Sequence, residues 1–118
     1  MRGGRTGHLG GLAAEEIAAR LYLAEGAEIA ARRWRSAAGE IDLVVTLPGF
    51  TVFVEVKARR DHARAAHALG PAQARRLRAA AEIYLAAAGG GDCRFDLVLI
   101  DRAGRAERVE NALRFDDW

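Results

Sequence analysis

Two apolar runs, residues 40–47 and 51–58, dominate the middle of the sequence, and Pro48 and Gly49 join them. Each run is rich in Val, Leu, Ile and Phe and has the length of a β-strand. A Pro-Gly pair between two such runs is typical of a tight turn. The segment therefore predicts a β-hairpin, and the rest of the chain must pack around it.

The flanking segments show helix and strand patterns. An apolar stripe that repeats every three or four residues predicts a helix over residues 11–25. A second stripe begins after Pro71, which suits a helix start, and ends at the glycines of residues 89–91, which suit a helix end. Further strands are predicted at residues 28–35, 94–100 and 107–110. This order of elements predicts an α/β fold in which helices pack on a mixed sheet.

The length of 118 residues fits a single domain spanning residues 1–118. We expect residues 1–10, which are polar and rich in glycine, and residues 115–118 to be loose. No apolar run approaches the ~20 residues of a membrane helix, and the N-terminal segment does not have the pattern of a signal peptide. The single cysteine, Cys93, cannot form an internal disulfide, which fits a reducing compartment. We therefore expect a soluble cytoplasmic protein without a membrane partner.

Basic residues are concentrated in the middle of the chain. Between Lys57 and Arg78, seven basic residues face a single acid, Asp61, although the net charge of the whole chain is only +2. Such a segment suits a polyanion such as DNA. A solvated surface in an arginine-rich protein explains the charge equally well. If the partner is a nucleic acid, the candidate phosphate contacts are Arg59, Arg60, Arg75 and Arg78.

The hairpin carries charged residues on one face only. Because side chains alternate along a strand, the other face is apolar, with Ile41, Leu43, Val45, Leu47, Val52, Val54 and Val56. Asp42, Glu55 and Lys57 share the charged face. Keeping the apolar face together gives a register with the pairs Thr46–Thr51, Val44–Phe53 and Asp42–Glu55. A shift by two residues would place Asp42 opposite Lys57 instead, and in either register the three charged groups converge.

Two carboxylates at opposed positions of a hairpin repel each other unless something compensates their charge. Mg²⁺ or Mn²⁺ would compensate, because such ions bind one or two carboxylates together with waters and phosphate oxygens. We expect the ligands to be Asp42, Glu55 and the backbone carbonyl of Val56. Lys57, the only lysine among 18 basic residues, would orient or activate a water and offset charge on a phosphate. The simpler alternative is a Glu55–Lys57 ion pair on a half-exposed face.

The spacing Asp-x12-Glu-Val-Lys in the hairpin resembles the PD-(D/E)xK nuclease core, which restriction endonucleases and archaeal Holliday junction resolvases share. More closely, the segments EEIAARLYLAEG, GEIDLVV, VFVEVKAR and RFDLVLI resemble the YraN family of small nuclease-like bacterial proteins. The resemblance covers nearly the whole chain. It implies a restriction-endonuclease-like α/β sandwich around a mixed sheet, with Asp42, Glu55 and Lys57 as the motif residues.

The resemblance also implies a fourth carboxylate on the first helix, which falls on Glu15 and would be a further catalytic residue and metal or water ligand. Glu15 lies beside the apolar stripe without a cation at i+3 or i+4, whereas Glu16 has Arg20 at i+4. An acid that complements the helix dipole is the rival interpretation of Glu15. At a family position that is usually basic this chain has Gln73, which would touch a phosphate or the site without charge. For Glu40 the alternatives are a supporting acid behind the site and a strand-end charge, and we favour the strand-end charge.

The leading expectation is a Mg²⁺- or Mn²⁺-dependent endonuclease that hydrolyses DNA phosphodiester bonds, with branched DNA as a candidate substrate. The alternative is a catalytically silent nucleic-acid-binding module of a recombination or repair pathway, and a purely structural interaction protein is the third hypothesis. The complete set of acids and lysine favours the enzyme, although a motif alone does not guarantee activity. A two-fold substrate such as a DNA junction would favour a homodimer.

Overall fold

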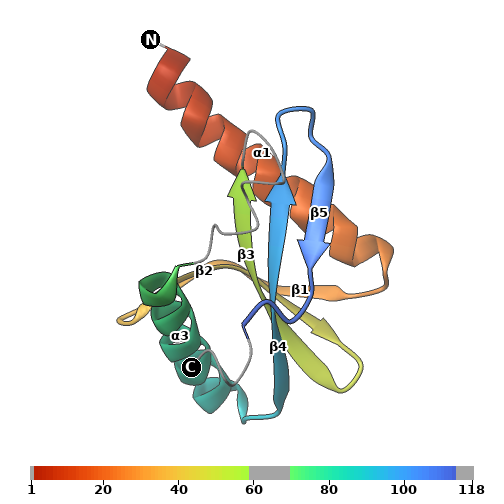
Figure 1. The fold of residues 1–118 in the computed structure, drawn as a ribbon. Coiled ribbons are helices and arrows are strands. Elements are labelled where there is room, and N and C mark those ends of the chain that lie inside the picture. Colours follow the sequence, from red (N-terminus) through yellow and green to blue (C-terminus); the bar gives the residue numbers. More distant parts are fainter. Residues whose placement is uncertain (1, 59–69, 114–118) are drawn as a thin grey trace.

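The computed structural model describes residues 2–58 and 70–113, which form a mixed sheet with a helix on each face (Figure 1). The elements in chain order are α1 (Arg2–Ala24), β1 (Glu28–Ser36), β2 (Gly39–Leu47), β3 (Phe50–Ala58), α3 (Pro71–Ala88), β4 (Asp92–Ile100) and β5 (Ala106–Val109). In the sheet, the strands follow one another in the order β1-β2-β3-β4-β5. Within these residues, the predicted α/β class and the predicted order of elements are confirmed.

The β3–β4 pair is parallel, and the other neighbouring pairs are antiparallel. Strands that run in the same direction need a crossover between them, and α3 lies in the segment that connects β3 to β4. α3 begins at Pro71 and ends at Ala88, as the sequence predicted. Proline fits the first turn of a helix, and Gly89 closes the last turn because it adopts a left-handed φ of 97°.

α1 begins earlier in the chain than its apolar stripe indicated. The prediction placed the start at residue 11, whereas helical backbone runs from Arg2. The glycines among residues 1–11 favoured a loose segment, since glycine is a poor helix former, but propensity is only a weak guide to the structure of a segment. Within the described part of the chain, neither helix has the combination of length and apolarity that crossing a membrane requires.

Two apolar cores lie on opposite faces of the sheet. The core under α1 includes Ala14, Ala18, Ala19, Tyr22, Leu43, Val45, Val52, Val54, Val98 and Ile100. The core under α3 includes Ile41, Val44, Phe53, Ala74, Leu77, Ala80, Ala81 and Phe95. In the second core, Tyr84 makes edge-on ring contacts with Trp34 and Phe53. Because β2 and β3 are covered on both faces, an acid on either strand lies in a largely apolar environment.

The register of the central hairpin agrees with the first of the two predicted alternatives. The confirmed pairs are Thr46–Thr51 and Val44–Phe53. They exclude the shift by two residues that would have placed Asp42 opposite Lys57. The regular pairing of β2 with β3 ends at Leu43 and Val54, one step before the predicted Asp42–Glu55 pair. Asp42 and Glu55 are therefore neighbours at the end of the ladder and not a pair within it.

The face that the sequence predicted for Ile41 is wrong. A regular strand would place Ile41 on the same face as Leu43, but Leu43 packs under α1 and Ile41 packs under α3. The alternation of β2 therefore breaks at Asp42, which lies between them. On β1, Arg33 lies opposite this break and has a left-handed φ of 49°. Both strands are irregular at the same level, and a rule of strict alternation does not anticipate such a break.

Candidate active site

Asp42 lies where the regular pairing of β2 with β3 ends. Its Oδ2 atom accepts a hydrogen bond of 2.8 Å from the backbone N–H of Val56. In a regular antiparallel ladder that N–H would bond to a backbone carbonyl of β2, so the side chain of Asp42 takes the place of a main-chain acceptor. The break in the ladder thus holds a carboxylate between the two strands.

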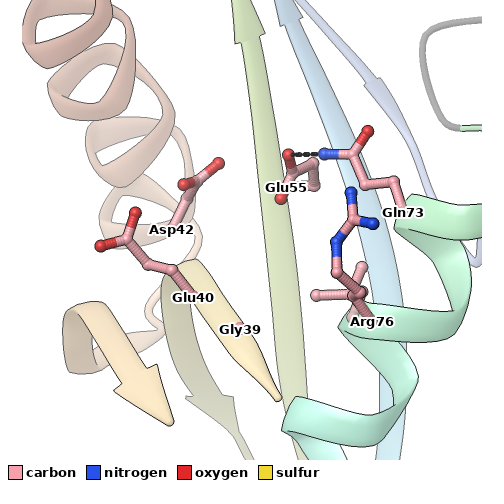
Figure 2. A pocket seen from close by; sticks show the side chains of 7 residues that line it. Gly39, Glu40, Asp42, Glu55, Gln73 and Arg76 are labelled. Atoms are coloured by element: carbon pink, nitrogen blue, oxygen red, sulfur yellow. Dashed lines mark hydrogen bonds between the residues drawn. The ribbon is translucent and has the colours of Figure 1, made fainter. Parts of the chain in front are cut away.

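Glu55 is buried in β3 and has two partners that bind the same oxygen. The side-chain amide of Gln73, in the first turn of α3, donates a hydrogen bond to Oε2 of Glu55 (Figure 2). The Nζ atom of Lys57 lies 3.3 Å from this oxygen, and the side chains of Lys57 and Glu55 are only 20% and 11% exposed. The ion pair that we considered as the simpler alternative is therefore present, but it lies in a mostly buried setting and not on a half-exposed face.

A pocket of about 150 Å³ opens between the ends of the strands and α3. It is lined by Gly39, Glu40, Asp42, Glu55, Gln73, Arg76 and Leu77. In Figure 2, Asp42 and Glu40 lie on one side of the pocket, and Gln73 and Arg76 reach toward Glu55 from the helix on the other side. The volume is several times the roughly 30 Å³ that one water occupies in the liquid, so that several waters or a phosphate group can enter.

Burial makes both carboxylates of the pocket hard to ionise. It raises the pKa of Glu55 to about 7, and the nearby Asp42 carboxylate adds to the rise, while Lys57 opposes it. Burial also raises the pKa of Asp42, against the hydrogen bond from the N–H of Val56, which lowers it. Neighbouring acids that share a site repel each other's negative charge. A proton or a bound cation would relieve this repulsion.

The donor atoms of the pocket suit a hard divalent cation. Among the described residues, no group of three or more His, Cys, Asp or Glu side chains is arranged to hold a metal by itself. Mg²⁺ does not require such a group, because it keeps several waters and binds through one or two carboxylates and substrate phosphates. Asp42 and Glu55 provide this pair of carboxylates. An all-oxygen pair in an acidic pocket fits Mg²⁺ or Mn²⁺ and does not resemble a structural zinc site.

Glu15 faces the sheet from α1, near the break at Asp42. Its Oε1 atom lies 3.2 Å from Nε of Arg33. Burial is the main cause that raises the pKa of Glu15, and the charge of Asp42 is the next. Glu15 has no cation at i+3 or i+4, and its ion-pair partner Arg33 comes from β1. Glu16 forms the predicted ion pair with Arg20, at 3.2 Å.

The predicted phosphate contacts are in different situations. Arg75 is exposed on α3, whereas Arg78 is half-buried with its Nε atom enclosed. The predicted contacts Arg59 and Arg60 lie outside the described residues. Reasoning from the sequence missed Arg76, which lines the pocket. Its spacing of three residues from Gln73 could have revealed it, since side chains at i and i+3 of a helix are neighbours.

Gln73 and Glu40 both line the pocket. Gln73 binds a carboxylate of the site, so its hydrogen-bond donor is engaged within the protein. Glu40 pairs with Arg35 at 3.0 Å, which agrees with a strand-end charge, but it also lines the pocket. Its charge raises the pKa of Asp42. Glu40 therefore adds to the negative potential that a cation in the pocket would meet.

Fold and site together define an α/β protein in which two acids and a lysine from adjacent strands meet beneath a helix. The profile of the family described as "Uncharacterised protein family UPF0102" matches residues 14–100. A UPF0102 protein of Ruegeria pomeroyi is 48% identical over 112 residues, covering 92% of this chain and 91% of its own. A UPF0102 protein of Granulibacter bethesdensis is 44% identical over 120 residues, covering 99% of this chain and 75% of its own. The chain belongs to the UPF0102 family, which confirms the YraN-like resemblance of the sequence.

Proposed function

We propose that this protein is a Mg²⁺- or Mn²⁺-dependent nuclease that hydrolyses phosphodiester bonds in DNA. The observation that carries the proposal is the meeting of Asp42, Glu55 and Lys57 at one end of the β2–β3 hairpin, beside a pocket large enough for a phosphate group. The resemblance of the hairpin to the PD-(D/E)xK nuclease core supports the same conclusion. The basic residues near the pocket favour a nucleic acid as the substrate.

Asp42, Glu55 and the backbone carbonyl of Val56 would hold the ion. In a strand, the N–H and C=O of one residue point to the same neighbouring strand. The N–H of Val56 points to Asp42, so its carbonyl is expected to face the same side. The ion would supply a positive charge that polarises a phosphoryl oxygen and stabilises the charge that builds up in the transition state.

Lys57 would act on the attacking water and on the phosphate. Its ammonium group stays beside Glu55 in a mostly buried position, where a fixed charge stabilises a developing negative charge more strongly than in water. An ammonium group donates hydrogen bonds and accepts none. It can therefore orient a water through the water oxygen, or bind a phosphate oxygen, while Glu55 keeps it in place.

Arg76 would bind the phosphate that enters the pocket. It comes from α3 and points toward Glu55 and Gln73 (Figure 2). Within the described residues it makes no ion pair that would occupy its guanidinium group. Arg75, exposed on the same helix, would contact a neighbouring phosphate. Because such contacts release counterions from DNA, we expect the affinity to fall steeply as the salt concentration rises.

A catalytically silent binding module is the second candidate, and one observation favours it. The acids of the site already have protein partners: Glu55 binds Gln73 and Lys57, and Glu15 binds Arg33. A polar network whose members satisfy one another is stable without a metal. A protein that only binds DNA through this surface would keep the fold and the basic residues without turning over the substrate.

The two candidates are separated by an assay with end-labelled duplex, flap, four-way junction and single-stranded DNA, with Mg²⁺, with Mn²⁺ and with EDTA. Enzyme variants Glu55→Gln and Lys57→Ala are compared with Glu82→Gln, which changes an exposed acid of α3. The nuclease predicts metal-dependent products that the first two variants lose and the third retains. Retained DNA binding without products in any lane would establish the silent module instead.

A further inference from the structure

Arg33 is placed in an unusual way for a residue of an edge strand. Its neighbours in the chain, Arg32 and Trp34, pair regularly with Leu43 and Ile41 of β2. Arg33 lies between them, opposite Asp42, and has a left-handed φ of 49°. This conformation is unfavourable for any residue other than glycine unless the surrounding structure enforces it, and such residues are frequent at functional sites.

The neighbouring acids form a field of negative charge around the Arg33 side chain. Its Nε atom lies 3.2 Å from Oε1 of Glu15. The guanidinium of Arg33 lowers the pKa of both Glu15 and Asp42. The charges of Asp42 and Glu40 raise the pKa of Glu15, and the charge of Glu40 raises that of Asp42. One positive charge from β1 therefore stabilises the ionised form of two acids, one from α1 and one from β2.

The two members of the ion pair differ in their freedom to move. The side chain of Glu15 is 16% exposed, while that of Arg33 is 41% exposed. A long side chain at this exposure can exchange its protein partner for water at little cost. If charge in the site changes, Arg33 is the member that moves.

This inference rests on the proposed function. We propose that Arg33 holds Glu15 in place while the site is free of metal. When a divalent cation binds at Asp42 and Glu55, the Arg33 side chain leaves Glu15. An added divalent charge repels the guanidinium and competes with it for the negative charge of Asp42. Without metal, the ion pair offsets the charge of Glu15. Glu15 becomes available to the site only when the ion is present.

Arg32 provides a matched control for Arg33. It is the preceding residue of the same strand, it also pairs with a glutamate of α1, and its side chain is similarly exposed, at 48%. Its partner is Glu16, at 3.1 Å, which is not one of the proposed site residues. Removal of Arg32 changes the net charge by the same amount but leaves the Glu15 contact intact.

The test is a calorimetric titration of Mn²⁺ into the DNA-free protein, with the wild type, Arg33→Gln, Arg33→Gly and Arg32→Gln. Glycine adopts the left-handed conformation without strain, so the Arg33→Gly variant removes the charge while keeping the backbone as it is. We expect both Arg33 variants to bind Mn²⁺ about fivefold more tightly than the wild type, since a nearby positive charge has been removed. Arg32→Gln is expected to stay within about twofold of the wild type.

An NMR experiment follows the side chain itself. Addition of Mg²⁺ is expected to shift the Nε–H signal of Arg33 and to leave that of Arg32 unchanged. Equal Mn²⁺ affinity in the wild type and both Arg33 variants, or an unchanged Arg33 signal at saturating Mg²⁺, would overturn the role of Arg33 and leave the metal site in place. Absence of Mn²⁺ binding from every variant would instead refute the proposed metal site, and the inference with it.

Discussion

The backbone N–H of Val56 on β3 donates a 2.8 Å hydrogen bond to the carboxylate of Asp42 on β2. This contact begins where the regular pairing of the two strands stops. One side chain thus both completes the hydrogen bonding of the hairpin and presents an acid to Glu55. The candidate site is a consequence of the irregular end of the hairpin. Asp42 therefore has a structural role, as acceptor for the N–H of Val56, and a proposed functional role, as an acid of the site, and substitutions can separate the two.

Asp42→Asn and Asp42→Ala should differ in stability but not in metal binding. The amide oxygen of asparagine can still accept the hydrogen bond from Val56, whereas alanine leaves a part-buried N–H without its partner, which costs about 1–3 kcal/mol. Urea unfolding of the metal-free proteins should therefore show Asp42→Asn close to the wild type and Asp42→Ala less stable. Both variants should lose Mn²⁺ affinity. Equal destabilisation of the two would show that the hydrogen bond does not support the hairpin.

The stability of the metal-free protein should depend on the protonation of Glu55. The pKa of Glu55 is about 7 in the folded protein, against an ordinary value of 4.5. Between these values the folded protein keeps a proton that the unfolded chain has lost, so the free energy of unfolding falls as the pH rises from about 4.5 to 7 and then levels off. The expected loss is on the order of 3 kcal/mol.

Thermal unfolding in EDTA across this pH range measures the effect. Glu55→Gln removes the titrating group, so the stability of this variant should not show the decrease with pH that Glu55 causes in the wild type. The variant should be more stable than the wild type, most clearly at pH 8. Glu82→Gln, on the exposed face of α3, should keep the slope of the wild type. A wild-type curve that rises over this interval in parallel with that of Glu55→Gln would contradict the assignment.

Arg76 and Arg75 should affect different steps of the reaction with DNA. Arg76 lines the pocket and Arg75 is exposed beside it on the helix. Arg76→Gln is expected to lower the cleavage rate at saturating DNA by about tenfold to a hundredfold, because it removes a positive charge from the reacting phosphate. Arg75→Gln should weaken DNA binding and reduce its salt dependence with little change in that rate. Single-turnover rates and fluorescence anisotropy measure the two effects, with Arg105→Gln in the β4–β5 turn as the control.

The buried acid Asp96 should prove to be structural. The hydroxyl group of Tyr22 donates a 2.6 Å hydrogen bond to Asp96, and Arg94 binds the same carboxylate through two nitrogen atoms at 2.8 Å. Tyr22→Phe should lower the free energy of unfolding by about 1–2 kcal/mol, since a buried acceptor loses a donor. Its Mn²⁺ affinity and cleavage rate should equal those of the wild type. A loss of metal binding in this variant would connect Asp96 to the site.

The regular parts of this fold are predictable from local rules. The hairpin register follows from the alternation of apolar residues and the Pro48–Gly49 turn, and the ends of α3 follow from Pro71 and Gly89. The convergence of Asp42 and Glu55 was predictable for the same reason. The alternation of side chains along each strand and the length of the turn place both acids at one end of the hairpin.

The irregular parts required tertiary information. The face change at Ile41 and the left-handed φ of Arg33 depend on how two strands meet α1 and α3 together, and an arginine gives no local signal for such a conformation. The sequence also favoured Arg75 and Arg78 by charge alone. The choice of Arg76 depends on the rotation of α3 against the sheet, which is set by the burial of Ala74 and Leu77.

The central claim, that Asp42 and Glu55 form a divalent-cation site, is tested most directly by anomalous diffraction from crystals soaked in Mn²⁺. We predict one strong anomalous peak within coordination distance of both carboxylates and of the Val56 carbonyl, and its absence from crystals of Glu55→Gln. A saturating soak that gives no peak between these two side chains, or the same peak in the variant, would contradict the account.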